Sequence, residues 1–90
     1  MKIRSEEQKK MLQNRLRRIE GQVRGISTML EEERECSEIL QQLSAVRSAI
    51  QGATRIFLEQ MVNDCLINEE SDASAKQEVA REIVELITRN

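Results

Sequence analysis

Apolar residues recur at alternating intervals of four and three along the first third of the chain. The residues with this spacing are Leu12, Leu16, Ile19, Val23, Ile26 and Leu30, and the pattern is typical of a helix in a bundle or coiled coil. A second apolar stripe, on one side of a helical wheel, comprises Ile39, Leu43, Val46, Ile50, Phe57 and Met61. The chain contains no proline, three glycines and a single aromatic residue. These features predict an all-α protein packed through aliphatic side chains.

We expect three helices in a single domain covering residues 1–90. The first helix is predicted over about 5–33, the second over about 36–66 and the third over about 74–88. Ser5 with Gln8, and Ser74 with Gln77, have the spacing of capping boxes, and the segment 68–74 is predicted to be a loop. Gly52 interrupts the second helical stretch, but no proline or other turn residue accompanies it. A continuous helix is therefore favoured over a hairpin.

The length and composition also bear on assembly and compartment. A chain of 90 residues buries only a modest part of its apolar surface alone, so we expect an oligomer. No apolar run approaches the ~20 residues that span a bilayer, and the charged N-terminus does not resemble a signal peptide. We expect a cytoplasmic protein with no membrane partner. In that compartment, two cysteines are typically free thiols, metal ligands or redox sensors rather than a structural disulfide.

Positive charge is concentrated at the start of the chain. Residues 1–25 contain eight Lys or Arg and three Glu, whereas residues 26–90 contain six basic and thirteen acidic residues. Lys10, Arg17 and Arg24 recur every seven residues, away from the apolar stripe, while Arg15, Arg18 and Gln22 follow one flank of it. Such a face fits phosphate contacts with some groove recognition, although many charged faces are only solvated. The candidate DNA contacts are Lys9, Lys10, Arg15, Arg17, Arg18, Gln22 and Arg24, with Arg47 as an addition.

The two cysteines, Cys36 and Cys65, lie on one face of the predicted second helix, together with Met61. They are 29 positions apart, so a straight helix separates them by roughly 43 Å and they cannot meet within one chain. Two antiparallel copies of the helix would bring Cys36 beside the partner's Cys65. Cys36 also lies near a helix N-terminus, where the dipole favours the thiolate. One activated and one less activated thiol suit attack on an oxidised sulfur followed by resolution.

Two other interpretations of the cysteines stay open. In the first interpretation, each cysteine is only a small buried hydrophobic residue. In the second, Cys36, Cys65 and Met61 bind Cu(I), which accepts soft sulfur ligands. Zinc, nickel and cobalt are disfavoured because the chain has no histidine, and Met61 is better explained as core filling than as a ligand. Catalysis is not expected, since there is no histidine base, Gly-rich phosphate loop or nucleophile elbow.

The stretch Arg15–Ile26 (RLRRIEGQVRGI) resembles the signature of the CsoR/RcnR family of bacterial repressors, as do Cys36 and the run Leu43–Ala49. The resemblance implies an all-α protein whose antiparallel dimers pair into tetramers and bind operator DNA until an inducer releases them. Copper-sensing members carry a histidine where Met61 stands. Retention of both cysteines without that histidine is similar to the persulfide-sensing, CstR-like branch, in which sulfane sulfur links the two thiols across the dimer.

The sequence therefore predicts a homotetrameric repressor, not an enzyme, that needs no cofactor and senses low-molecular-weight persulfides or polysulfides. Cys36 and Cys65 are the expected sensor thiols. The alternatives are a Cu(I)-responsive repressor that uses Cys36, Cys65 and Met61, and a helical scaffold protein whose cysteines only pack.

Overall fold

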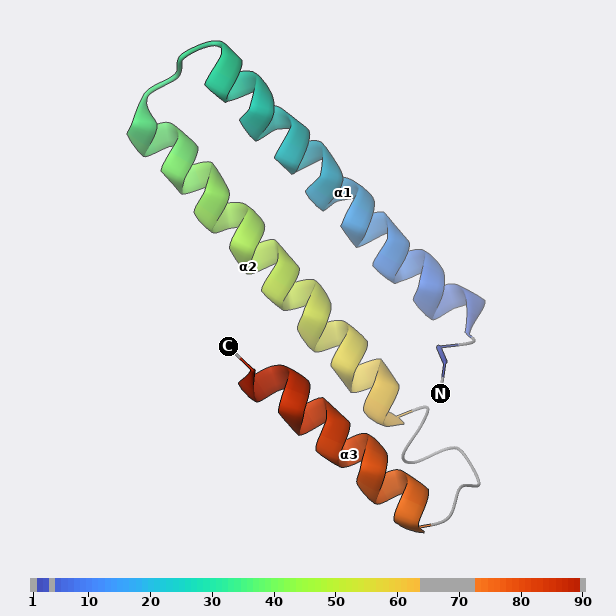
Figure 1. The fold of residues 1–90 in the computed structure, drawn as a ribbon. Helices are drawn as coiled ribbons and strands as arrows, with labels where there is room; N and C mark the ends of the chain where they lie inside the picture. The colour runs from blue at the N-terminus through green and yellow to red at the C-terminus, as the bar shows by residue number, and fades with distance from the viewer. Residues whose placement is uncertain (1, 4, 64–72, 90) are drawn as a thin grey trace.

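The computed structural model describes residues 2–3, 5–63 and 73–89. It contains the helices α1 (Glu6–Glu31), α2 (Cys36–Met61) and α3 (Ala73–Thr88). The first two form an antiparallel hairpin, and α3 lies beside the C-terminal half of α2, on the side away from α1 (Figure 1). No strand occurs in the described parts of the chain. The predicted all-α class with three helices is confirmed.

Capping explains where α1 begins. The Ser5 hydroxyl oxygen accepts a hydrogen bond from the Gln8 backbone N–H at 3.3 Å, as the capping-box spacing predicts. The reciprocal bond is not made, because the Gln8 side-chain oxygen is buried without a partner. The cap predicted at Ser74 is wrong, since α3 already includes Ala73. Most of the loop predicted over 68–74 lies outside the described residues.

The turn between α1 and α2 is a tight helix-terminating motif. Glu33 adopts φ 55, the left-handed conformation that glycine usually supplies. The Arg34 N–H donates to the Met29 carbonyl at 3.0 Å, and the Glu33 N–H donates to the Leu30 carbonyl at 3.2 Å. These two bonds satisfy carbonyls at the end of α1, so the chain reverses direction within four residues and α2 starts at Cys36.

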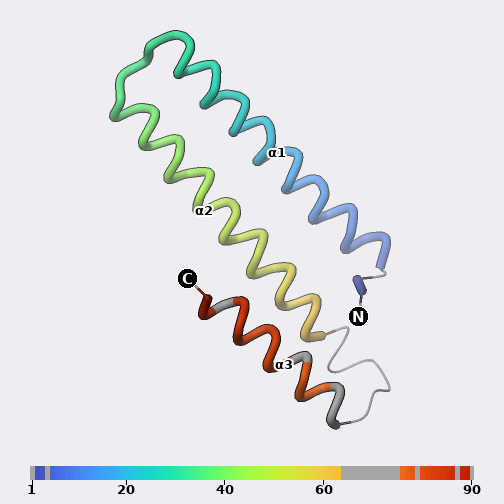
Figure 2. Tube along the Cα trace, viewed as in Figure 1, coloured from blue at the N-terminus to red at the C-terminus, as the bar shows by residue number. Residues whose placement is uncertain are grey.

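Helix α2 runs without a break through Gly52, so the prediction of one continuous helix is confirmed (Figure 2). The α-helix ends at Met61, and the segment 64–66, which the sequence placed in the same helix, lies outside the described residues. At 1.5 Å per residue, Cys36 and Met61 are separated by roughly 37 Å along the helix axis. The two ends of α2 therefore cannot share a site within one chain.

The apolar residues of the hairpin divide into two sets, each with a seven-residue spacing. We call the buried set the inner seam: it comprises Leu12, Ile19 and Ile26 of α1 with Val46 and Ala53 of α2, and half-buried Ile39 packs against it. We call the other set the outer stripe: it comprises Leu16, Val23 and Leu30 of α1 with Leu43, Ile50 and Phe57 of α2. Side chains of the outer stripe are 43% to 60% exposed. Half of each apolar stripe noted in the sequence is therefore exposed in a single chain.

A second, smaller core joins α3 to the rest of the chain. Met61 and Ile83 are buried against each other, and Ile3, Leu58 and Val62 pack around them. Val84 and Leu86 of α3 are exposed. The side chains of Val79 and Ile87 lie outside the described part of the chain. Much of α3 is thus uncovered.

The overall dimensions show that the packing of one chain is incomplete. The Cα trace measures 55 × 29 × 13 Å and its radius of gyration is 17.2 Å, whereas a compact chain of this length has a radius of roughly 12 Å. A thickness of 13 Å is a single layer of helices. No described side chain falls below 2% exposure. None of the described helices is long and apolar enough to cross a membrane.

Candidate nucleic-acid interface and thiol site

Several basic residues of α1 lie on the side of the helix that faces away from α2, whereas the Arg15 side chain extends toward Gly52 of α2. Between Gln8 and Thr28 the sequence contains six Lys or Arg and one Glu. Lys10, Arg17 and Arg24 are exposed and lie opposite the inner seam on the helical wheel, and exposed Arg18 lies on one flank. A 26-residue helix is roughly 39 Å long. The face therefore offers a long row of cations, which suits an extended polyanion.

Local contacts distinguish the members of this row. The Lys9 ammonium forms a salt bridge with Glu6 at 2.9 Å, and the Arg17 guanidinium donates to the Asn14 side-chain oxygen at 3.1 Å. Gln22 is half-buried, and its side-chain oxygen has no hydrogen-bond partner. Gln22 is therefore placed less favourably for a DNA contact than the exposed arginines, and Lys9 must leave Glu6 to bind a phosphate.

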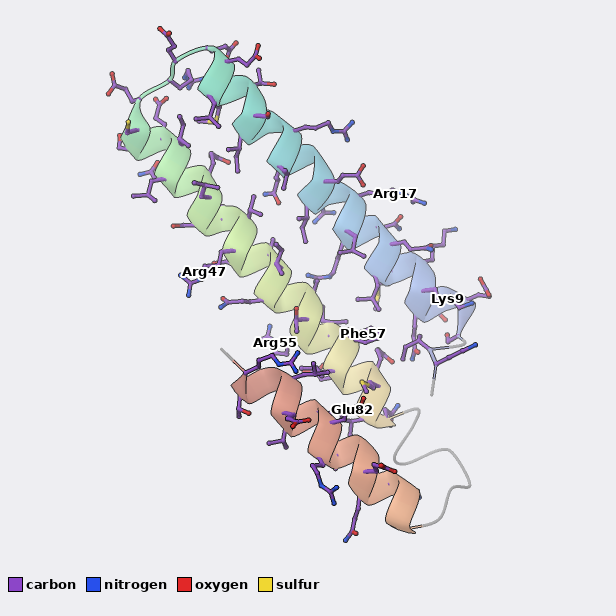
Figure 3. All side chains as sticks on the ribbon, in the orientation of Figure 1. Lys9, Arg17, Arg47, Arg55, Phe57 and Glu82 are labelled. Atoms are coloured by element: carbon purple, nitrogen blue, oxygen red, sulfur yellow. The ribbon has the colours of Figure 1, made fainter. Side chains whose placement is uncertain are left out.

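Arg47 does not join this surface. It is exposed on α2, and Figure 3 places it on the outer side of α2 while Arg17 lies on the outer side of α1. Within one chain, Arg47 and Arg17 therefore lie on opposite sides of the hairpin. Arg55, which sequence reasoning did not select, is also exposed, and Figure 3 shows it on the side of α2 that faces α3. Its isolated position among apolar and neutral residues gave no sequence signal.

The outer stripe includes an apolar groove. A cavity of about 380 Å³ lies where the start of α1 meets the second half of α2. Residues that line it are Ile3, Lys9, Leu12, Gln13, Leu16, Ile50, Ala53, Thr54 and Phe57. Figure 3 shows Phe57 on the inner edge of α2, toward α1. The groove and the stripe together form an uncovered apolar face, which is the type of surface that associates with another polypeptide. The sequence signal for it was the second seven-residue repeat, which we interpreted as part of one stripe.

Cys36 is the first residue of α2 and is exposed as a free thiol. It precedes Leu43, Ile50 and Phe57 by multiples of seven, so it extends the outer stripe. A salt bridge joins Arg34, in the connection before α2, to Glu38 in the first turn of α2 at 2.9 Å. Cys65, the second predicted thiol, lies outside the described residues. The structure thus describes one thiol of the pair, at the end of the apolar face.

Met61 has the surroundings of a core residue. Its side chain is 9% exposed and packs with Ile83 of α3. Because Cys36 is at the opposite end of α2, the two sulfur atoms of one chain cannot share a metal ion. The chemistry of a Cu(I) site therefore fits the two cysteines better than it fits Met61, whose use as a ligand would disrupt the contact between α2 and α3.

Comparisons with known proteins agree on one family. Residues 8–89 match the family model described as metal-sensitive transcriptional repressor. The copper-sensing transcriptional repressor CsoR of Bacillus subtilis is 38% identical over 76 residues, which cover 84% of this chain and 75% of that protein.

Two solved structures have the same fold. The copper-sensing repressor CsoR with Cu(I) from Geobacillus thermodenitrificans is 34% identical, with a TM-score of 0.87 over 99% of this chain and 92% of that chain. A variant of the formaldehyde-responsive regulator FrmR from Salmonella enterica serovar Typhimurium is 36% identical, with a TM-score of 0.86 over 92% and 93% of the two chains. These relatives are transcriptional repressors or regulators and not enzymes, which excludes the scaffold alternative. The chain belongs to the metal-sensitive transcriptional repressor family, also named after CsoR and RcnR, and is a transcriptional repressor.

Proposed function

We propose that this repressor binds operator DNA through α1 and senses low-molecular-weight persulfides through Cys36 of one subunit and Cys65 of its partner. The observation that carries the proposal is the position of Cys36, which is exposed at the end of the outer stripe. Relatives named for copper and for formaldehyde share this fold. The inducer is therefore set by the residues at the sensing site, and this chain has two cysteines and no histidine.

A second copy of the chain would bury the outer stripe. The stripe lines one side of both helices of the hairpin, so two hairpins that meet face to face form a four-helix bundle. A two-fold axis perpendicular to the helices would make the two copies of α2 antiparallel. Two such dimers would then pair through surfaces that include α3, where Val84 and Leu86 are exposed.

The same arrangement brings the thiols together. If Cys36 lies opposite the partner's Cys65, the residue numbers of any two opposed positions on the two helices add up to 101. Leu43 then falls opposite the partner's Leu58, and Ile50 opposite the partner's Gln51. The midpoint of the outer stripe on α2 is Ile50, so the register that joins the thiols also centres the two apolar stripes on each other. This agreement supports pairing between subunits rather than within one.

The proposed chemistry is a sulfur transfer followed by displacement. The Cys36 thiolate attacks the terminal sulfur of a persulfide R–S–SH and releases RS⁻, which leaves Cys36–S–SH. The partner's Cys65 thiolate then attacks the inner sulfur, forms a Cys36–Cys65 disulfide and releases HS⁻. The two thiols lose two electrons in total, and the transferred sulfane sulfur is reduced to hydrosulfide. When both cysteines carry a transferred sulfur, the same displacement produces a trisulfide and HS⁻.

Bridging would weaken DNA binding through a change in subunit geometry. Each bridge would fix the end of one α2 against its partner, and α1 packs against α2 between Ile39 and Ala53 through the inner seam. A bridge that favours a different spacing between hairpins therefore moves the two α1 basic faces relative to each other. A tenfold loss of operator affinity needs a coupling free energy of only about 1.4 kcal/mol.

The test is fluorescence anisotropy with a DNA fragment from upstream of the repressor's own coding sequence, at several salt concentrations. Reduced protein should bind with a strong salt dependence, and glutathione persulfide should release it. Cys36→Ala and Cys65→Ala variants should bind equally well but remain bound after persulfide treatment. Release of the Cys36→Ala protein would refute the sensing mechanism, whereas salt-independent or absent binding would contradict DNA recognition by α1.

Cu(I) is the second candidate inducer, and the copper-sensing relatives are the observation that favours it. Here Cu(I) would bind Cys36 and the partner's Cys65, without Met61. The two candidates separate in the same assay. If persulfide still releases the protein from DNA in the presence of a Cu(I) chelator, the protein is a sulfur sensor. If only stoichiometric Cu(I) releases it, the protein is a copper sensor.

A further inference from the structure

Gly52 is an unexpected residue for the middle of α2. It lies within a continuous helix, next to buried Ala53, and no glycine in the described chain has a positive φ. Glycine lowers helix stability at such a position relative to alanine. The backbone conformation therefore does not require glycine here, and the reason must be sought in what lies beside it.

The group beside Gly52 is the guanidinium of Arg15. A Cβ atom placed on Gly52 would lie 3.8 Å from Arg15 Nη1, with no other atom among its close neighbours. A Cβ atom placed on Gly21 or Gly25 would have no such neighbour within 4 Å. Arg15 thus extends from α1 across the seam between the helices, and its guanidinium occupies the place that a side chain at position 52 would take.

Arg15 lies beside α2 and is still accessible. The residue is exposed, and the two salt bridges of the described residues, Lys9–Glu6 and Arg34–Glu38, do not involve it. An exposed arginine beside a neighbouring helix can present its planar guanidinium to a phosphate for a bidentate contact. A methyl group at 3.8 Å is an ordinary van der Waals contact, but a longer side chain would compete for the same volume.

We infer that Gly52 is a positioning residue for DNA binding, because its missing side chain lets Arg15 lie across α2 where it contacts a phosphate. The inference rests on the proposed function, and it adds a residue of α2 to a surface otherwise built from α1. It predicts that the size of the residue at position 52, rather than its effect on helix stability, controls operator affinity.

The experiment is a set of salt-dependent anisotropy titrations of the full-length protein on the same DNA fragment. The variants are Arg15→Ala, Gly52→Ala, Gly52→Leu, Gly52→Gln and the double variant Arg15→Ala/Gly52→Leu. Ser48→Leu is the matched control, because it adds the same side chain one helical turn away at an exposed position. Circular dichroism and sedimentation identify any variant that fails to fold or assemble, and Gly52→Gln provides a polar, helix-compatible substitute for Gly52→Leu.

Arg15→Ala should weaken binding about tenfold and lower the salt slope by ~0.9 for each phosphate that is no longer neutralised. Gly52→Leu and Gly52→Gln should reproduce both changes, and the double variant should equal Arg15→Ala, as expected for two residues that act through one interaction. Gly52→Ala and Ser48→Leu should bind like the wild type. Wild-type affinity in folded Gly52→Leu and Gly52→Gln, additive effects in the double variant, or an unaffected Arg15→Ala would each overturn the inference while leaving DNA binding intact. Absence of salt-dependent binding by the wild type would instead overturn the proposed function.

Discussion

The substitution Ile50→Glu should separate the subunits, because it places a charge at the centre of the proposed dimer. Ile50 is 48% exposed in one chain, and in the antiparallel register it lies beside the two-fold axis. The two introduced carboxylates would therefore face each other in an apolar interface. The change leaves the inner seam untouched, so its effect falls on association rather than on the hairpin itself.

The expected magnitude follows from the exposure of the outer stripe. Complete burial of an aliphatic side chain contributes about 1.5–3 kcal/mol, so covering the exposed half contributes about 1 kcal/mol. Six such side chains give roughly 6 kcal/mol per chain and roughly 12 kcal/mol per dimer, from which the cost of association is subtracted. Ile50→Glu removes about 2 kcal/mol of this and adds the cost of desolvating two like charges. We expect the dissociation constant of the dimer to rise by about 10³-fold or more.

Sedimentation velocity over a range of protein concentrations measures this change directly. The wild type should sediment as an oligomer, and Ile50→Glu should dissociate to monomers that unfold at a lower temperature. Gln41→Glu is the matched control: it adds the same charge on the exposed side of α2 that lies away from the stripe, and it should leave assembly unchanged. An Ile50→Glu protein that assembles and melts like Gln41→Glu would refute the assignment of the outer stripe as the subunit interface.

Three other substitutions test the structure of the chain itself. Glu33→Gly should stabilise the protein by about 1 kcal/mol, because it removes the Cβ strain of a residue in the left-handed conformation. Its melting temperature should rise by several degrees. The control Glu32→Gly, at φ −81, should not raise the melting temperature. Ser5→Ala should cost about 1 kcal/mol through loss of the α1 cap, while Ser5→Asp should keep the wild-type midpoint in urea. Ile19→Ala, in the inner seam, should lower the free energy of unfolding by about 2–4 kcal/mol at every protein concentration. Val23→Ala, in the outer stripe, should mainly make the melting temperature more dependent on protein concentration. Identical behaviour of the two variants would contradict the division into inner seam and outer stripe.

The sequence was sufficient for the helices because their causes are local. The 4-3 apolar spacing, the Ser5 cap and the absence of proline determine α1 and α2 without reference to tertiary contacts. The continuous helix through Gly52 followed from the same reasoning, since an isolated glycine does not by itself break a helix. The start of α3 was misplaced by one residue, because Ser74 fits a cap equally well in the sequence.

The sequence could not predict which apolar residues pack inside one chain and which face outward. Leu16 and Ile19 have the same hydrophobic character and lie close together on the helical wheel, yet one is 53% exposed and the other 9%. The difference depends on where α2 lies, which is a tertiary property. Ala53 was overlooked as a core residue because it is small. For the basic set, local spacing identified the α1 face, but the separation of Arg47 from it required the geometry of the hairpin.

The central claim is that the sensing bridge joins Cys36 of one subunit to Cys65 of another, and a mixing experiment tests it most directly. Cys36→Ser and Cys65→Ser proteins are reduced, mixed so that subunits exchange, and treated with glutathione persulfide, and covalent products are measured by intact mass under non-reducing conditions. We predict that the mixture forms a covalent dimer containing one protein of each kind, as a disulfide or ~32 Da heavier as a trisulfide, and that each variant alone stays monomeric. Equal cross-linking in the separate variants, or none in the mixture while the wild type reacts within single chains, would contradict the antiparallel pairing of the two subunits.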